Sequence, residues 1–78
     1  MNMVGRINIY NDRSNKEKTI SVKNVLETVL ILSNLYLKFQ NCKLLDICNK
    51  IAAMKQGENL GATIYLKGGN RLNILVCN

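Results

Sequence analysis

The spacing of apolar residues changes twice in the middle of the chain. Over residues 22–32 these residues recur at helical spacing, which predicts an amphipathic helix. Over residues 35–40 they alternate with polar residues, which predicts a strand. Helical spacing returns over residues 44–52. The middle of the chain is therefore expected to form a helix, a strand and a second helix.

The end of the first helix can be placed in two ways. Ser21 is a good N-cap residue, and the poor helix formers Ser33 and Asn34 mark a break before the alternating segment. A single helix over residues 22–39 is the alternative, because leucine and isoleucine occur in both helices and strands. The break, followed by strict alternation, favours the strand.

Strands are predicted on both sides of this segment. Residues 3–10 alternate between apolar and polar side chains, whereas residues 11–18 contain no apolar side chain and are expected to form a solvated loop. Near the other end, residues 62–67 and 71–77 alternate around Gly68-Gly69-Asn70. Such a glycine pair between two alternating runs is typical of a β-hairpin.

Together these elements predict one α+β domain over residues 1–78. Its order is β-α-β-α-β-β, with two helices packed on one face of a four-stranded mixed sheet. The first two strands are expected to be parallel because a helix connects them. The second helix is expected to run from Asn41 to about Gln56. If the first helix instead continues to residue 39, the order becomes β-α-α-β-β.

Charge and composition favour an acidic binding partner and argue against catalysis. Eleven Lys and Arg against five Asp and Glu give a net charge of +6, which favours an acidic partner such as DNA or RNA. The sequence has no His, its carboxylates are scattered, and its glycine pair precedes no helix. The usual catalytic base and a phosphate-binding glycine loop are therefore both missing. We expect a protein that is not an enzyme and that uses no cofactor.

The cysteines and the apolar segments indicate in which cellular compartment the protein is expected. Cys42, Cys48 and Cys77 have no paired spacing, and without His they cannot complete a four-ligand zinc site, so no metal is expected. Unpaired thiols are typical of reducing compartments. The first residues lack the apolar run of a signal peptide, and polar residues interrupt the apolar segment over residues 25–39. A cytoplasmic, nucleoid or nuclear location is expected, without secretion or contact with a membrane.

Basic residues flank the predicted strand ends. In the parallel arrangement, residues 11–18 and the junction at residues 38–43 lie at one edge, together with the N-termini of both helices. Lys and Arg beside helix N-termini bind phosphates. Tyr10 and Tyr65 add candidate stacking contacts for bases. The candidate nucleic-acid-binding residues are Arg13, Lys16, Lys18, Lys38, Lys43, Lys67 and Arg71.

Two apolar residues fall on surfaces that the pattern otherwise makes polar. Ile31 lies on the outer stripe of the first predicted helix, and Tyr36 shares a predicted strand face with polar neighbours. Apolar residues on a polar surface are typical of a protein interface. We therefore predict a homodimer with Ile31 and Tyr36 in its interface.

The predicted element order and two segments of the sequence resemble the Alba family. The segments are SVKNVLETVLILSN, residues 21–34, and LYLKFQNCKLLDICNKI, residues 35–51. The resemblance covers residues 3–55 as a pattern of apolar positions. It implies a small basic dimer that binds DNA or RNA without catalysis. The same layout is also similar to the C-terminal domain of a bacterial translation initiation factor, another RNA binder.

The resemblance also implies which lysines make contact. Lys16 and Lys18 would correspond to the family's lysines before the first helix, and Lys38 and Lys43 to its basic strand–helix junction. The family's glycine at this junction is Asn41 here. Its long basic hairpin arm is replaced by a short turn, so an arm that wraps a duplex is not expected.

Two functions follow as hypotheses. The first is nucleic-acid binding through phosphates with little sequence specificity, because no helix carries an obvious set of base-reading side chains. The alternative is a small protein-binding inhibitor with an acidic target surface, for example a mobile-element protein that blocks a host defence or nucleic-acid-processing machine. A salt-sensitive interaction with generic DNA or RNA would separate the two.

Overall fold

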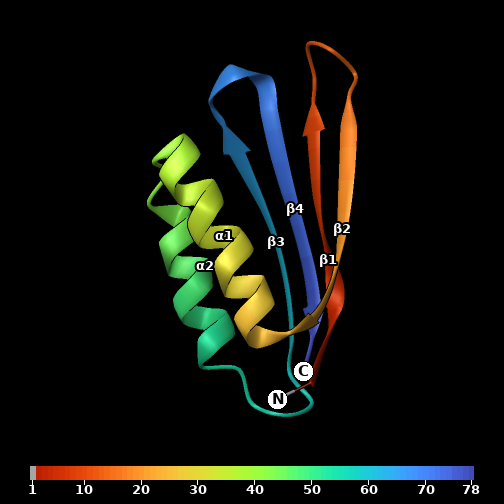
Figure 1. Cartoon of the computed structure of the whole chain (residues 1–78), viewed down its shortest axis with the longest axis vertical. Coiled ribbons are helices and arrows are strands. Elements are labelled where there is room, and N and C mark those ends of the chain that lie inside the picture. Colours follow the sequence, from red (N-terminus) through yellow and green to blue (C-terminus); the bar gives the residue numbers. More distant parts are fainter. Residues whose placement is uncertain (1) are drawn as a thin grey trace.

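A computed structural model describes residues 2–78 as two helices that lie side by side over a four-stranded sheet (Figure 1). The elements in chain order are β1 (Asn2–Asn11), β2 (Glu17–Asn24), α1 (Val25–Phe39), α2 (Lys43–Ala52), β3 (Asn59–Leu66), the short 3₁₀ turn η1 (Lys67–Gly69) and β4 (Asn70–Cys77). The chain is α+β, as expected. Its order, β-β-α-α-β-β, differs from the predicted β-α-β-α-β-β.

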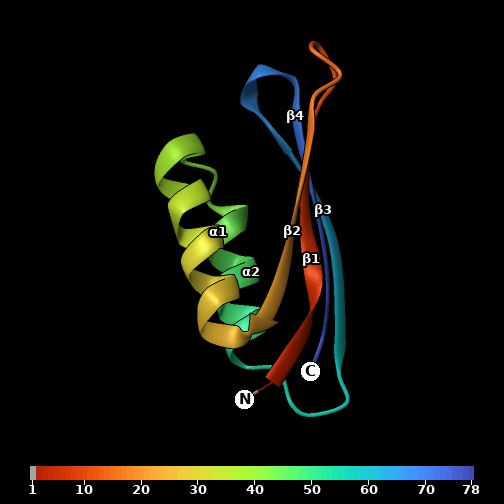
Figure 2. The same ribbon diagram turned by 45° about the vertical axis from the view of Figure 1, so that its right-hand side comes forward.

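The sheet has the strand order β2-β1-β4-β3, and every neighbouring pair is antiparallel. The prediction of a mixed sheet with two parallel strands is therefore wrong. β1 and β2 form a hairpin instead of being joined by a helix. Both helices lie on the same side of the sheet, and its other face is left open (Figure 2).

The core lies between this sheet face and the helices. Alternate residues of each strand point toward the helices, which is the two-residue period of a half-buried sheet. The buried apolar side chains of the sheet are Met3, Ile7, Val22, Ile64, Leu66, Leu72, Ile74 and Val76. Those from the helices and the loop after them are Leu32, Leu44, Ile47, Cys48, Ile51 and Met54. Burial of this apolar surface is the main term that stabilises the fold.

The strand predicted at residues 35–40 is wrong, because α1 continues without a break to Phe39. Leu35 and Phe39 are one helical turn apart and both pack against the core. Leu37, between them in sequence, is 70% exposed. The alternation that suggested a strand thus combines two residues from the buried side of a helix with one from its exposed side. The alternative of one long first helix correctly places its C-terminal end.

The start of α1 also differs from the prediction. The N-cap is Asn24, whose Oδ1 accepts a hydrogen bond from the Glu27 backbone N–H at 2.7 Å. Ser21, the predicted cap, lies in β2, a strand that replaces the end of the predicted loop and the first residues of the predicted helix. Ile20 of β2 pairs with Ile7 of β1.

The remaining elements match the sequence pattern closely. β1 covers the predicted first strand, and α2 falls inside the predicted second helix. The hairpin between β3 and β4 turns at Gly68 and Gly69, both with a φ of 79°, a backbone conformation that glycine adopts without steric cost. In the part of the chain that the structure describes, no helix has the length and apolar character needed to cross a membrane.

Candidate nucleic-acid interface

Three connections lie toward one end of the molecule: residues 12–16 between β1 and β2, residues 40–42 between α1 and α2, and η1 between β3 and β4 (Figure 1). β1, α1 and β3 all run toward this end, and β2, α2 and β4 run away from it. We call it the hairpin end. Asn41 Nδ2 donates to the Tyr65 carbonyl oxygen at 3.4 Å, which joins the helical connection to β3. β1 begins and β4 ends at the opposite end of the molecule (Figure 1).

The candidate cations gather at the hairpin end. They lie in its connections or beside them, at the adjoining ends of β2, β4, α1 and α2, and they are Arg13, Lys16, Lys18, Lys38, Lys43, Lys67 and Arg71. The predicted parallel strands do not exist, yet the antiparallel topology still brings these residues to one end. Of the two helix N-termini expected there, that of α2 is present and that of α1 lies at the opposite end (Figure 1).

Hydrogen bonds tie the two hairpins together. Asn11 Nδ2 donates to the Gly68 carbonyl at 3.1 Å and to Asn70 Oδ1 at 2.9 Å. The Asp12 backbone N–H donates to the Gly69 carbonyl at 2.8 Å. A Cβ added at Gly69 would lie 3.0 Å from Arg13 Cγ, so the Arg13 stem rests against the second hairpin. The cations of the two hairpins are therefore carried by turns that are hydrogen-bonded to each other.

The nearby carboxylates are partly engaged. An Asp12 oxygen lies 3.9 Å from a terminal nitrogen of the Arg71 guanidinium. Glu17 Oε1 accepts a hydrogen bond from Asn8 Nδ2 at 2.6 Å, on the open face of the sheet. Asp46 lies in the first turn of α2, whereas Glu27 and Glu58 belong to segments at the opposite end. Cations therefore outnumber carboxylates at the hairpin end.

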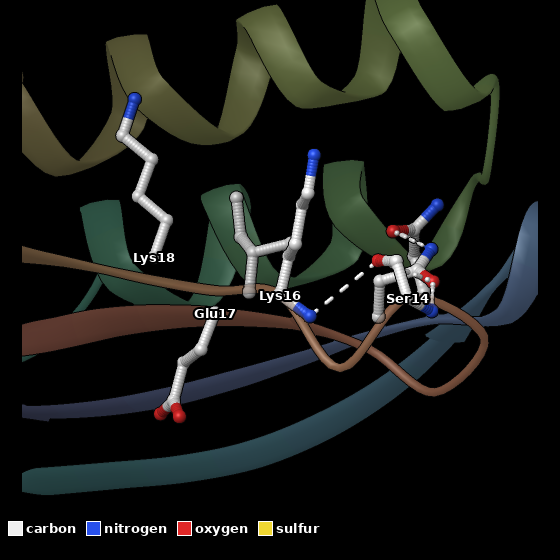
Figure 3. A pocket seen from close by; sticks show the side chains of 7 residues that line it. Ser14, Lys16, Glu17 and Lys18 are labelled. Carbon is white, nitrogen blue, oxygen red and sulfur yellow. Dashed lines mark hydrogen bonds between the residues drawn. The ribbon is translucent and has the colours of Figure 1, made fainter.

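A groove runs along the helix side of the sheet near this end. Figure 3 shows the Lys16 and Lys18 side chains on the same side of the ribbon and Glu17 on the other. This groove has a volume of about 420 Å³ and is lined by Ile9, Asn11, Ser14, Lys16, Glu17, Lys18 and Asn70. A neighbouring groove of about 400 Å³ is lined by Ile9, Lys18, Ile20, Ile31, Asn34, Leu35 and Lys38. Because Ile9 and Lys18 line both, the two grooves adjoin, and lysines line each of them.

The open face of the sheet carries a row of planar side chains that cross three strands. Tyr65 of β3 pairs with Arg71 of β4, which pairs with Tyr10 of β1. The Arg71 guanidinium lies 5.1 Å from the centre of the Tyr10 ring, a cation–π distance. Tyr65 is 71% exposed. Sequence reasoning named these residues but did not place them in one row.

The next row across the open face was not found from the sequence. It joins all four strands by side-chain hydrogen bonds, in the order Thr19, Asn8, Asn73 and Thr63. Asn8 Nδ2 donates to Thr19 Oγ1 at 2.9 Å, Asn73 Nδ2 to Asn8 Oδ1 at 3.4 Å, and Thr63 Oγ1 to Asn73 Oδ1 at 3.0 Å. The only sequence signal was Asn and Thr at outward positions of the strands. We call this row the polar ladder.

The two residues predicted for a dimer interface lie elsewhere than expected. Ile31 and Tyr36 are both half-buried against the core, and Ile31 also lines the groove. The exposed apolar residues of α1 are instead Leu26, Leu30 and Leu37, at 69%, 55% and 70% exposure. Their spacing places them along one side of the helix. We call them the leucine stripe.

The cysteines are all free. Cys42 and Cys77 are exposed, and Cys48 is buried. Burial raises the pKa of the Cys48 thiol, and a hydrogen bond with Ser33 offsets part of that rise. Over residues 2–78, no three His, Cys, Asp or Glu side chains lie close enough together to hold a metal ion.

Comparison with known proteins gives no family for this chain. No protein-family model, no curated protein and no solved structure matches it significantly. Function is therefore inferred from the hairpin end, the open face and the leucine stripe.

Proposed function

We propose that this protein is a non-catalytic nucleic-acid-binding protein that contacts phosphates through its hairpin end. The observation that carries the proposal is that cations far apart in the sequence gather at one end, on three separate connections. Nucleic acid is a dense polyanion, and each lysine or arginine that neutralises a phosphate releases condensed counterions. A cluster of cations at one end of a small +6 protein suits this kind of ligand.

The same geometry supports weak sequence specificity. Phosphate contacts fix position and orientation but carry no direct information about bases. Both helices have one side against the sheet, and the outward side of α1 is the leucine stripe rather than a set of base-reading polar side chains. The first backbone N–H groups of α2 are hydrogen-bonded to Asn41 and Cys42, so α2 contributes the Lys43 side chain and the positive end of its helix dipole rather than free donors.

The proposal is tested by removing two cations of the hairpin end. In the double variant Lys16→Ala and Lys18→Ala, binding of a short DNA duplex should weaken to a similar extent for unrelated sequences. Each lost phosphate contact should reduce the slope of log affinity against log salt by about 0.9, so by about 1.8 in total. Fluorescence anisotropy titrations between about 50 and 200 mM NaCl measure both quantities.

A matched control removes the same charge elsewhere. Lys50 lies at the end of α2 and Lys55 just after it, both exposed and away from the hairpin end. The double variant Lys50→Ala and Lys55→Ala should keep the native salt slope. Equal loss in the two double variants would mean that net charge, not the hairpin end, drives binding. Failure of the native protein to bind DNA or RNA at low salt would overturn the proposal.

The leucine stripe favours a second candidate function, that of a protein-binding module. Three exposed leucines along one side of a helix are typical of a surface that another protein covers. We take a second copy of this chain as the occupant. In an antiparallel pair of α1 helices, Leu26 of one copy lies near Leu37 of the other, and Glu27 lies near Lys38. This pairing joins apolar to apolar and negative to positive.

A further inference from the structure

We infer that the open face of the sheet binds unpaired bases, so that the preferred ligand is single-stranded nucleic acid. This inference rests on the proposed function and adds the class of ligand and a second contact surface. The contact surface is the row of Tyr65, Arg71 and Tyr10.

The row is continuous with the hairpin end. Tyr65 is separated from Lys67 of the turn only by the inward-facing Leu66, and Arg71 directly follows the first residue of β4. A strand of nucleic acid with phosphates against Lys67 therefore has its bases within reach of the Tyr65 ring. The Arg71 guanidinium, 5.1 Å from the centre of the Tyr10 ring, adds a second planar group beside it. Bases stack on aromatic rings and on guanidinium planes.

The charge of the open face is complementary to a phosphate chain. Alternation along the strands places Arg6, Lys23 and Arg71 on this face. Among the outward-facing side chains of the described strands, Glu17 is the one carboxylate, and Asn8 donates a hydrogen bond to it. Asp12 lies 3.9 Å from the Arg71 guanidinium and offsets part of its charge. The net positive charge that a ribose–phosphate chain meets on this face therefore comes mainly from Arg6 and Lys23.

The chemistry of the face favours single strands over duplexes. In a duplex the bases stack on one another and the phosphates lie outside, so the Tyr65 ring has no base face to contact. Unpaired bases expose that face. The polar ladder sets the limit on specificity, because the Asn8 and Asn73 amides are hydrogen-bonded to neighbouring side chains and to each other. The face therefore stacks bases without reading their edges.

The test compares a fluorescein-labelled 15-nucleotide oligo(dT) with a mixed-sequence duplex of the same length. In Tyr65→Ala, affinity for oligo(dT) should fall by about 5-fold or more, the amount expected for one base stacked on an aromatic ring. Affinity for the duplex should stay unchanged. The salt slope should also stay unchanged, because no phosphate contact is removed.

Tyr65→Phe is the matched variant, since it keeps the ring and removes only the hydroxyl. It should retain native affinity for oligo(dT). The protein has three Tyr and no Trp, so quenching of tyrosine emission on binding reports stacking directly, and this quenching should be smaller in Tyr65→Phe.

The outcomes separate this inference from the proposed function. Unchanged oligo(dT) affinity in Tyr65→Ala, with a loss in the Lys16 and Lys18 double variant, overturns the inference and leaves the proposed function in place. Equal loss of duplex and oligo(dT) affinity in Tyr65→Ala also overturns it. If the native protein binds neither ligand, both fail.

Discussion

At the scale of single residues, solvent exposure determines how reactive each of the three thiols is. Cys42 begins the turn into α2, and Cys77 lies on the open face at the end of β4, both in contact with solvent. Cys48 lies on the side of α2 that faces α1, with Ser33 and the Val29 carbonyl as neighbours. A raised pKa and burial both reduce the thiolate available for reaction.

We expect iodoacetamide at about pH 8 to alkylate Cys42 and Cys77 quickly in the native protein and Cys48 slowly, because only the exposed thiolate reacts. Mass spectrometry after proteolysis identifies the modified residues. All three should react at similar rates in guanidinium chloride. Fast native alkylation of Cys48, or a disulfide between any two cysteines, would contradict this prediction.

At the scale of elements, sequence reasoning succeeded where the structural signal is local. Gly68 and Gly69 specify the β3–β4 turn through their own backbone conformation, so neighbouring residues were enough. The end of α1 was misassigned because Leu35, Leu37 and Phe39 alternate with polar residues, and the sequence alone does not show that Leu37 is an exposed apolar residue. Packing against the core favours the helix over the strand, because in the helix Leu35 and Phe39 contact the core while Leu37 is exposed.

β2 could not be recognised for a related reason. It is an edge strand, and only Ile20 and Val22 point toward the core. Without β2, the polar ladder and the antiparallel topology could not be predicted either. The cations of the candidate interface were predictable by residue type. Their gathering at one end was expected from the wrong topology, and both topologies bring residues 12–18 and 38–43 together.

Substitution of Gly5 in β1 and Gly61 in β3 tests how closely these strands approach β4. A Cβ added at Gly5 would meet the Leu75 carbonyl and lie 2.7 Å from Val76 Cα, whereas one added at Gly61 would lie 3.8 Å from Leu75 Cδ1. Gly5→Ala should lower the free energy of unfolding by about 1–3 kcal/mol, as overpacking does. Gly61→Ala should leave it nearly unchanged. Urea unfolding followed by circular dichroism measures both, and equal effects would count against the β1–β4 register.

At the scale of the whole molecule, the leucine stripe bears on association. We expect light scattering to show a dimer at about 100 μM. Leu30→Glu should shift it toward monomer, because burying an unpaired carboxylate in the interface is energetically unfavourable. Asn49→Glu, at an exposed position on α2, carries the same charge change away from the stripe and should remain dimeric. Ile31→Glu is unsuitable as a probe, since Ile31 packs against the core.

A monomeric native protein would contradict the dimer. It would also overturn the second candidate function, whose occupant is a second copy of this chain. Native circular dichroism of Leu30→Glu is the check that any loss of association does not come from unfolding.

The centre of the sheet is made by the first and last strands, β1 and β4. During synthesis, the β1–β2 hairpin and the helices emerge long before β4 does. A two-stranded hairpin is at best marginally stable in water, so the early part of the chain has no complete core to fold onto. Closing the β1–β4 pair encloses nearly the whole chain in one loop, and such non-local pairing slows folding. We therefore expect the sheet to close only once β4 is available, and a chain that lacks β4 to be the form most open to proteases.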